Sequence, residues 1–281
     1  MKHMPNAQSW SVISAPPSDR IILGVDFPAA GRREAGFDEL VAGMGSAWSE
    51  YGFLQTVPPT VGLADRPTGD YYTEHWMRAG DWEQYEVVAV FGYCVGSVYA
   101  AEIARRLTGT QGTAPKVVLF DPQLTDVQLL ANEMHKMIAM AGPVFSEEEA
   151  EQGRRRATAI VEGTSAVLAE AAVEIVDLYR ELATLAFQRI GLSDSRRDEV
   201  VRLFESYMTW LSAAAQVDPS DVWQRSVGIT SDDFAAQEEA GDPMVVDAVK
   251  VLGRRFPLGL GHADLMRDEA AVRVLVDHVG L

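Results

Sequence analysis

The chain has 281 residues, of which 47% are hydrophobic, and carries a formal net charge of −17. The length suits one large α/β domain, or a core domain with an insertion, and is enough to bury a substantial core. The acidic balance argues against nucleic-acid binding, because phosphate recognition needs a basic surface. The single cysteine excludes an internal disulfide and a cysteine-based metal site, which suits a reducing cytoplasm.

Residues 1–19 contain Pro16 and Pro17 and predict a loose lead-in. After them, buried strands alternate with amphipathic helices. We expect strands at 20–27, 53–57, from residue 86 onward and at 116–120, and helices at 37–48, 70–82 and 97–107. This alternation predicts a mostly parallel sheet with helices on both faces, whose functional groups gather at the carboxyl ends of the strands.

The pattern changes at Thr125, where strand signals stop and apolar residues recur at three- and four-residue spacing. Helices are expected at 126–141, 147–163, 165–190 and 196–217. We interpret residues 125–220 as a helical lid over a site, although a plain helical subdomain would show the same apolar stripes.

Strand and helix signals return in the last part of the chain. We expect strands at 222–230 and 255–258, an acidic turn at 231–233, and helices at 244–252 and 269–279. The core domain should therefore comprise residues 20–124 and 221–281.

The sequence Gly92-Tyr93-Cys94-Val95-Gly96 lies where a strand changes to a helix. It matches the G-x-S-x-G nucleophile elbow, with cysteine in place of serine. Glycines are needed because the turn is too sharp for flanking β-carbons, and the strained turn lifts the nucleophile clear of the sheet. A thiol here would stand at the mouth of a helix, where the peptide dipole favours its anionic form. We interpret Cys94 as a nucleophile rather than as a small apolar residue in a glycine-rich turn.

A cysteine nucleophile needs a base, and an acid that orients the base. Of the five histidines, only His262 lies in a glycine-flanked loop after a late strand, where a sheet hydrolase presents its base. The alternative is a loop histidine that caps the last helix. The candidate acids are Asp121 and, at another strand end, Asp232 or Asp233. We prefer Asp121 because it follows the strongest strand, next to the strand of the nucleophile.

Acyl transfer creates an oxyanion that needs two amide donors. The amide of Val95, directly after the nucleophile, is expected to be one. The other is expected from Ala30, with Ala29 as the neighbouring alternative, in the turn after the first strand.

Four segments together resemble a known family: FPAAG at 27–31, GYCVG at 92–96, VVLFDP at 117–122 and GLGHADLM at 259–266. They are similar to the thioesterase domains that release chains from polyketide synthases and nonribosomal peptide synthetases. The resemblance implies an α/β-hydrolase fold with nucleophile, acid and base in this order and a helical lid between the last two. It also implies an acyl or peptidyl carrier protein as partner, with the substrate on its phosphopantetheine. No metal or cofactor is expected.

The cysteine departs from the serine that is usual in that family. With a cysteine at this position, the chain resembles a minority branch of the family, the standalone Dieckmann cyclases of tetramic acid biosynthesis. These are a class of antibiotic-forming enzymes. The resemblance implies transfer of a β-ketoacyl aminoacyl chain to Cys94 and carbon–carbon bond formation that releases a pyrrolidine-2,4-dione.

Two other functions stay open at this point. One is a thioesterase with the same Cys94, His262 and Asp121 that hydrolyses or edits its substrate, or forms a lactone or lactam. The other is a non-catalytic hydrolase-like protein in which Cys94 is merely buried and a hydrophobic ligand is bound. With no apolar run long enough for a signal peptide or a membrane span, we expect a cytoplasmic protein that binds neither membrane nor nucleic acid.

Overall fold

The structure is a computed structural model that describes residues 5–15, 17–28, 33–163 and 167–281. The chain forms two compact units. The first comprises Met1–Pro59, Gly69–Leu124 and Val217–Leu281, and the second comprises Thr60–Thr68 and Thr125–Gln216.

The first unit is built on a seven-stranded sheet, ordered β1-β3-β2-β4-β5-β6-β7. Its strands are β1 (Trp10–Ser14), β2 (Arg20–Val25), β3 (Gly52–Thr56), β4 (Glu86–Tyr93), β5 (Lys116–Phe120), β6 (Val227–Thr230) and β7 (Arg254–Pro257). The β1–β3 pair is antiparallel and every other neighbouring pair is parallel. The predicted mostly parallel sheet is thereby confirmed.

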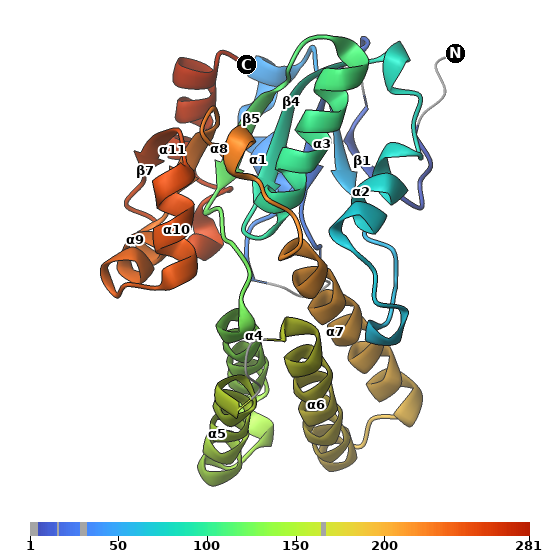
Figure 1. The fold of residues 1–281 in the computed structure, drawn as a ribbon, viewed down its shortest axis with the longest axis vertical. Coiled ribbons are helices and arrows are strands. Elements are labelled where there is room, and N and C mark those ends of the chain that lie inside the picture. The colour runs from blue at the N-terminus through green and yellow to red at the C-terminus, as the bar shows by residue number, and fades with distance from the viewer. Residues whose placement is uncertain (1–4, 16, 29–32, 164–166) are drawn as a thin grey trace. The chain divides into compact units, whose positions relative to one another are not determined.

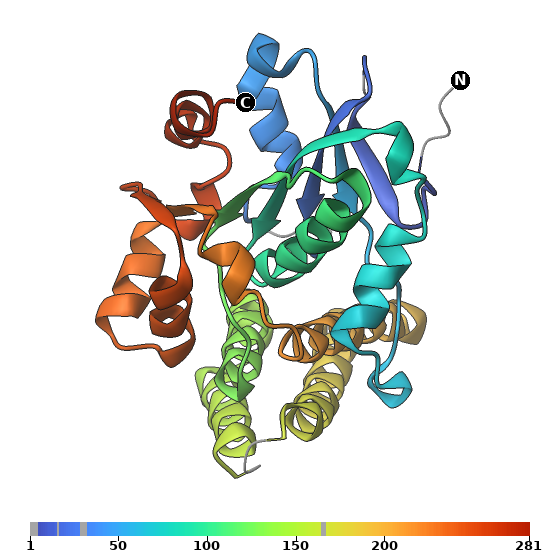
Figure 2. The ribbon, with the colours of Figure 1, turned by 45° about the horizontal axis from the view of Figure 1, so that its top comes forward.

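Helices cover both faces of this sheet (Figures 1 and 2). The helices of the unit are α1 (Phe37–Met44), α2 (Gly69–Met77), α3 (Gly96–Gln111), α8 (Ser220–Trp223), α9 (Asp232–Glu239), α10 (Pro243–Val251) and α11 (Glu269–Val274). Short 3₁₀ segments η1 (Gly45–Trp48), η3 (Trp82–Gln84) and η5 (His262–Asp264) and a π-helical turn η6 (Leu275–Val279) complete it. On one face α1 and α11 pack on the strands around Phe53, Phe91 and Phe120. On the other, α3 packs against β2, β4 and β5.

The predicted loose lead-in at 1–19 is wrong for β1. Trp10 is 1% exposed, and its indole N–H donates to the carbonyl oxygen of Trp76 at 2.9 Å. Val12, on the same strand, is exposed. An edge strand of five residues buries only part of its surface, so its apolar signal is too short and too diluted by polar residues to be recognised.

Two further expectations near the end of the chain need correction. Val222 and Trp223 belong to α8, so the strand expected at 222–230 begins only at Val227. Trp223 is buried by a helix instead, and its indole N–H donates to the carbonyl oxygen of Ser97 at 3.1 Å. The acidic turn expected at 231–233 is the start of α9, whose N-cap is Ser231. Burial alone does not distinguish a short helix from a strand.

The second unit is helical. It contains η2 (Leu63–Asp65), α4 (Val127–Met140), η4 (Gly142–Val144), α5 (Glu147–Gly163), α6 (Leu168–Ile190) and α7 (Asp194–Ala214). Within it α4 packs against α5 and α6, and α6 packs against α7. The segment 60–68 joins this unit, which the sequence did not indicate, through a hydrogen bond from the Leu63 amide to Glu205 Oε1 at 3.2 Å. The role of residues 125–220 as a lid stays a prediction. None of the helices in the described part of the chain is both long and apolar enough to cross a membrane.

Candidate active site

Cys94 lies in a two-residue turn between β4, which ends at Tyr93, and α3, which begins at Gly96. Its backbone φ is 50°, a left-handed conformation that is strained for a residue with a side chain. Both glycines of the motif are required by packing. A β-carbon on Gly92 would overlap the backbone of Ser97, and one on Gly96 would overlap the carbonyl oxygen of Val25. The predicted strand–turn–helix around Cys94 is therefore present, with the geometry of a nucleophile elbow.

Asp121 occupies the corresponding position after the neighbouring strand β5. Its φ is 43°, and its amide donates to the carbonyl oxygen of Ile229 at 3.0 Å. Its carboxylate is 4% exposed and accepts two hydrogen bonds from Ser231, at 2.7 Å from the amide and 2.6 Å from the hydroxyl. Because these donors satisfy the buried carboxylate, they fix its orientation.

His262 begins η5, in the loop after β7. Its Nδ1 lies 2.7 Å from Asp121 Oδ2. A carboxylate only accepts hydrogen bonds, so Nδ1 carries the proton and Nε2 is left as the basic nitrogen. The structure thus brings together the predicted base and the preferred acid, which are 141 residues apart in the chain.

The other two candidate acids have different contacts. Asp233 Oδ2 accepts a hydrogen bond from the backbone amide of His262 at 2.7 Å, so this carboxylate holds the loop and not the imidazole ring. Asp232 donates its amide to the carbonyl oxygen of Leu260 at 2.8 Å. Both residues lie in the first turn of α9, where acidic residues are favoured by the helix dipole. Of the three carboxylates, Asp121 is the one that orients the imidazole.

Tyr93 is a member of the site that sequence reasoning missed. Its hydroxyl lies 2.8 Å from His262 Nε2 and 3.2 Å from the carbonyl oxygen of His262. The phenol and imidazole rings are stacked, with centroids 4.8 Å apart and planes 16° apart. With Nδ1 protonated, Nε2 accepts the hydrogen bond and the phenol donates it. The sequence held one indication of this role, because Tyr93 directly precedes Cys94 within the elbow motif.

Gln123 is a second residue that was missed. Its side-chain oxygen accepts a hydrogen bond from the Cys94 thiol at 3.3 Å, and its amide donates to the carbonyl oxygen of Cys94 at 3.4 Å. Cys94 in turn donates its amide to the carbonyl oxygen of Phe120 at 2.9 Å, which extends the β4–β5 pairing by one residue. Position 123 directly follows the Asp121-Pro122 turn, so its nearness to Cys94 depends on the pairing of these two strands.

Of the expected oxyanion donors, only Val95 lies among the described residues. Val95 has helical backbone angles and is the N-cap of α3. The first amides of a helix have no acceptor within the helix, so the Val95 N–H is suited to bind an oxyanion. Ala30 and its alternative Ala29 lie outside the described residues.

Comparison with solved structures gives full-length matches of low identity. The Vlm2 thioesterase domain, with genetically encoded 2,3-diaminopropionic acid and bound with a dodecadepsipeptide, matches with a TM-score of 0.50 and 16% identity, covering 98% of each chain. BpoC from Mycobacterium tuberculosis, a candidate non-heme bromoperoxidase, matches with a TM-score of 0.50 and 13% identity, covering 99% of this chain and 97% of its own. The chain has the α/β-hydrolase fold. No family model and no curated protein matches it.

The α/β-hydrolase fold explains why Asp121 and His262 meet and why Cys94 lies at the same edge of the sheet. Catalytic groups of this fold follow the chain order nucleophile, acid, base, and each sits beyond the carboxyl end of a strand. Cys94, Asp121 and His262 follow β4, β5 and β7 in the same order. Chemically, such an arrangement can activate a thiol, transfer an acyl group to it and return a proton to the leaving group.

The tyrosine–histidine contact leads to a testable expectation. Tyr93 donates to Nε2 of His262, the nitrogen that would accept the Cys94 proton if His262 were its base, and in that role the phenol would compete with the thiol. Tyr93→Phe should keep the stacked ring but free Nε2, and should raise the rate of Cys94 alkylation by iodoacetamide about three- to ten-fold at neutral pH. Mass spectrometry of the alkylated protein measures this directly, because the chain has a single cysteine. Slower alkylation would instead mean that the phenol holds His262 in the position that activates the thiol.

Proposed function

We propose that the protein is a chain-releasing cyclase that takes a β-ketoacyl aminoacyl thioester from a carrier protein onto Cys94. The released product is a tetramic acid, a pyrrolidine-2,4-dione, formed by Dieckmann condensation. The observation that carries the proposal is a thiol, instead of a hydroxyl, in a left-handed elbow at the carboxyl end of β4. The hydrogen-bonded pair His262–Asp121 supplies the base and its orienting acid.

The first step exchanges one thioester for another. The Cys94 sulfur attacks the aminoacyl carbonyl, His262 Nε2 takes the thiol proton, and the phosphopantetheine thiol leaves with a proton returned by His262. The oxyanion formed on the way would be bound by the Val95 amide. Because a thioester is formed at the expense of a thioester, the acyl group on Cys94 keeps its reactivity towards a carbon nucleophile.

The second step closes the ring. The methylene between the ketone and the amide carbonyl is acidic enough to lose a proton to His262, directly or through the thiolate. The resulting carbanion attacks the Cys94 thioester carbonyl, a carbon–carbon bond forms and the carbon–sulfur bond breaks. The Cys94 thiolate is then reprotonated by His262, and the proton balance closes within the site.

The comparisons support acyl transfer at the level of the fold. A thioesterase domain bound with a dodecadepsipeptide is among the matches of full length. A serine enzyme of this fold would form an oxygen ester, which is a poorer acceptor for a carbanion than a thioester. The cysteine therefore favours cyclisation over the hydrolytic alternative.

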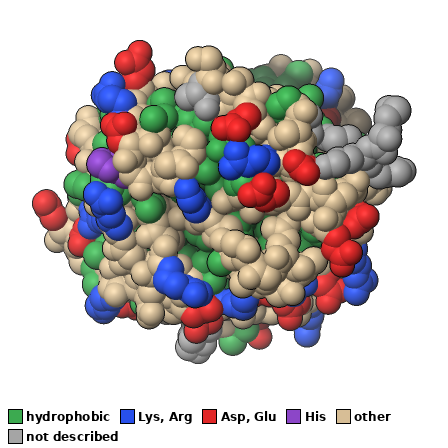
Figure 3. All heavy atoms as spheres, turned by 90° about the horizontal axis from the view of Figure 1, so that it is seen from above, with side chains coloured by type: hydrophobic (Ala, Val, Ile, Leu, Met, Phe, Trp, Pro, Cys, Tyr) green, Lys and Arg blue, Asp and Glu red, His purple; other side chains and the backbone are tan. Residues whose placement is uncertain are grey.

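We infer a carrier protein as partner from the proposed thioester substrate and not from a basic docking surface. The arginines at 154–156, 196–197 and 254–255 could meet an acidic carrier. Six of these seven side chains pair with a nearby carboxylate, and the seventh, Arg254, lies over the ring of Phe256. Figure 3 likewise shows basic and acidic side chains interspersed on one face of the molecule. Docking would then rely on the pantetheine arm and on surface shape more than on net charge.

The test uses a β-ketoacyl aminoacyl thioester of N-acetylcysteamine as a carrier mimic. We expect the cyclic product and one equivalent of free thiol, detected by mass spectrometry and by a thiol reagent. The β-ketoacyl amino acid as the only product would overturn the cyclase and identify a hydrolytic thioesterase. Absence of turnover together with total resistance of Cys94 to iodoacetamide in the native protein would identify a non-catalytic ligand-binding protein.

A further inference from the structure

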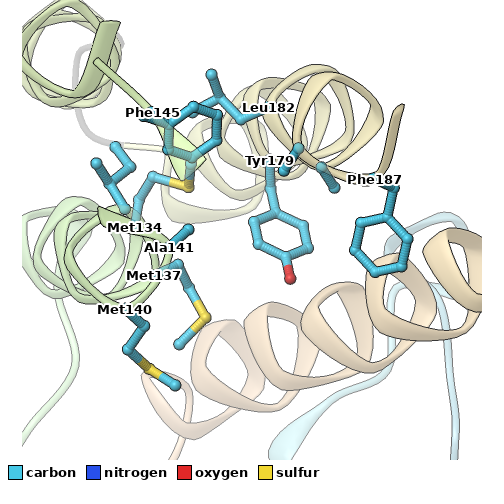
Figure 4. A pocket seen from close by; sticks show the side chains of 11 residues that line it. Met134, Met137, Met140, Ala141, Phe145, Tyr179, Leu182 and Phe187 are labelled. Atoms are coloured by element: carbon cyan, nitrogen blue, oxygen red, sulfur yellow. The ribbon is translucent and has the colours of Figure 1, made fainter. Parts of the chain in front are cut away.

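The helical unit contains an apolar cavity of about 250 Å³ between α4, the η4 turn and α6. Ten of its eleven lining side chains are hydrocarbon or thioether, and the eleventh is Tyr179. Figure 4 shows methionines of α4 on one side, the rings of Tyr179 and Phe187 on the other, and Phe145 beside Leu182. We propose that this cavity binds an apolar chain of about ten carbons that carries a single carbonyl or hydroxyl group.

The cavity has a definite origin in the sequence. The face of α6 that lines it carries alanine at 183 and 186, where larger residues would close the space. Both alanines are buried and form the floor of the cavity, which is open on one side, where Met140 is exposed. The facing side of α4 supplies Met134 and Met137, whose unbranched side chains adjust to ligands of different shape. Small residues on one wall and adaptable ones on the other are suited to a chain that can slide into place.

The size and lining define the class of ligand. A dry cavity of about 150 Å³ lined by aliphatic and aromatic side chains accepts benzene, so about 250 Å³ accommodates roughly ten carbons. Water needs two to four polar partners, which a wall with one hydroxyl does not supply. The cavity therefore favours hydrocarbon over solvent.

Tyr179 adds one point of polar recognition. Its ring is stacked on Phe204 of α7, with centroids 4.1 Å apart, and burial raises the pKa of its phenol. The neutral hydroxyl points between Met137 and Phe187 in Figure 4. It can donate to a carbonyl or carboxylate oxygen of the chain, or accept from a hydroxyl.

The turn that carries Phe145 is held in place by an ion pair. Arg189 donates to both carboxylate oxygens of Glu149, at 2.5 and 2.8 Å, and to the carbonyl oxygen of Val144 at 3.0 Å. These hydrogen bonds lower the pKa of Glu149 to about 2, so the pair persists through the neutral range. The η4 turn, and with it Phe145, is thereby tied to α6 before any ligand binds, which reduces the ordering that binding requires.

This inference is independent of the chemistry proposed for Cys94, and the test separates the two. The Cys94→Ala protein is titrated by calorimetry with straight-chain fatty acids of four to fourteen carbons, below their micellar concentrations. Affinity should rise about four-fold with each added methylene and level off at about ten carbons. The decanoyl thioester of N-acetylcysteamine is titrated in parallel. Tighter binding of the thioester would identify the acyl group of a thioester substrate as the ligand, and tighter binding of the free acid would identify a lipid.

Two substitutions locate the site. Ala186→Leu adds three carbons to the wall and should move the plateau to about seven carbons, whereas Ala183→Phe should weaken decanoate binding at least ten-fold. Val173→Phe, on an exposed face of the same helix, is the matched control and should change neither value. Circular dichroism melting confirms that each variant is folded. An unchanged plateau in a folded Ala186→Leu protein, affinity that keeps rising beyond twelve carbons, or no decanoate binding by the Cys94→Ala protein would overturn the proposal.

Discussion

Replacing Cys94 by alanine is expected to reduce thiol release from the β-ketoacyl aminoacyl thioester by about 10⁵- to 10⁶-fold, because the proposed acyl-enzyme needs the sulfur that alanine lacks. Alanine keeps the β-carbon that the left-handed backbone at φ 50° already accommodates, so the fold should persist. The measurement is the initial rate of N-acetylcysteamine release, with intact-protein mass spectrometry to detect acylation.

Cys94→Ser tests whether ring closure needs a thiol at this position or whether any nucleophile is enough. A serine hydroxyl in the same elbow can still be acylated with His262 as base, but its ester is a weaker electrophile than a thioester. We expect slower overall release and a larger share of the free acid relative to the cyclic product. A serine variant that cyclises as fast and as completely as the native protein would show that the thioester is not needed for ring closure.

The fold was predictable where strands are buried on both faces. The run KVVLF gives β5 at Lys116–Phe120, with the predicted bounds, because β-branched and aromatic residues fill both sides of a central strand. β1 was missed, since an edge strand is apolar on only part of its surface. The short helix α8 was mistaken for strand because its apolar residues Val222 and Trp223 fit a buried strand as well as a buried helical turn.

The site was predictable only as far as local motifs extend. The elbow and the strand-end carboxylate are each encoded within a few residues, and both have the left-handed backbone that such turns require. The choice between Asp121 and Asp233 depends on how α9 and η5 pack, which no local pattern encodes. The same holds for the Tyr93–His262 stack, whose partners are 169 residues apart.

Asp121→Asn is the second substitution with a large expected effect. The native carboxylate accepts the proton of His262 Nδ1 at 2.7 Å and two hydrogen bonds from Ser231. An asparagine that keeps its oxygen towards Ser231 presents an NH₂ group to Nδ1, which drives the imidazole proton to Nε2. Nε2 then cannot accept the thiol proton, and kcat for thiol release should fall about 10⁴-fold with little change in KM.

Asp233→Asn is the matched control, because its side-chain oxygen can still accept the amide proton of His262. We expect less than a ten-fold loss in kcat and a melting temperature close to that of the native protein. Comparable losses in the two variants would refute the assignment of Asp121 as the orienting acid. If Asp233→Asn alone abolished turnover, the acid would instead act from α9, and the buried Asp121–Ser231 contacts would serve only to join β5 to β6.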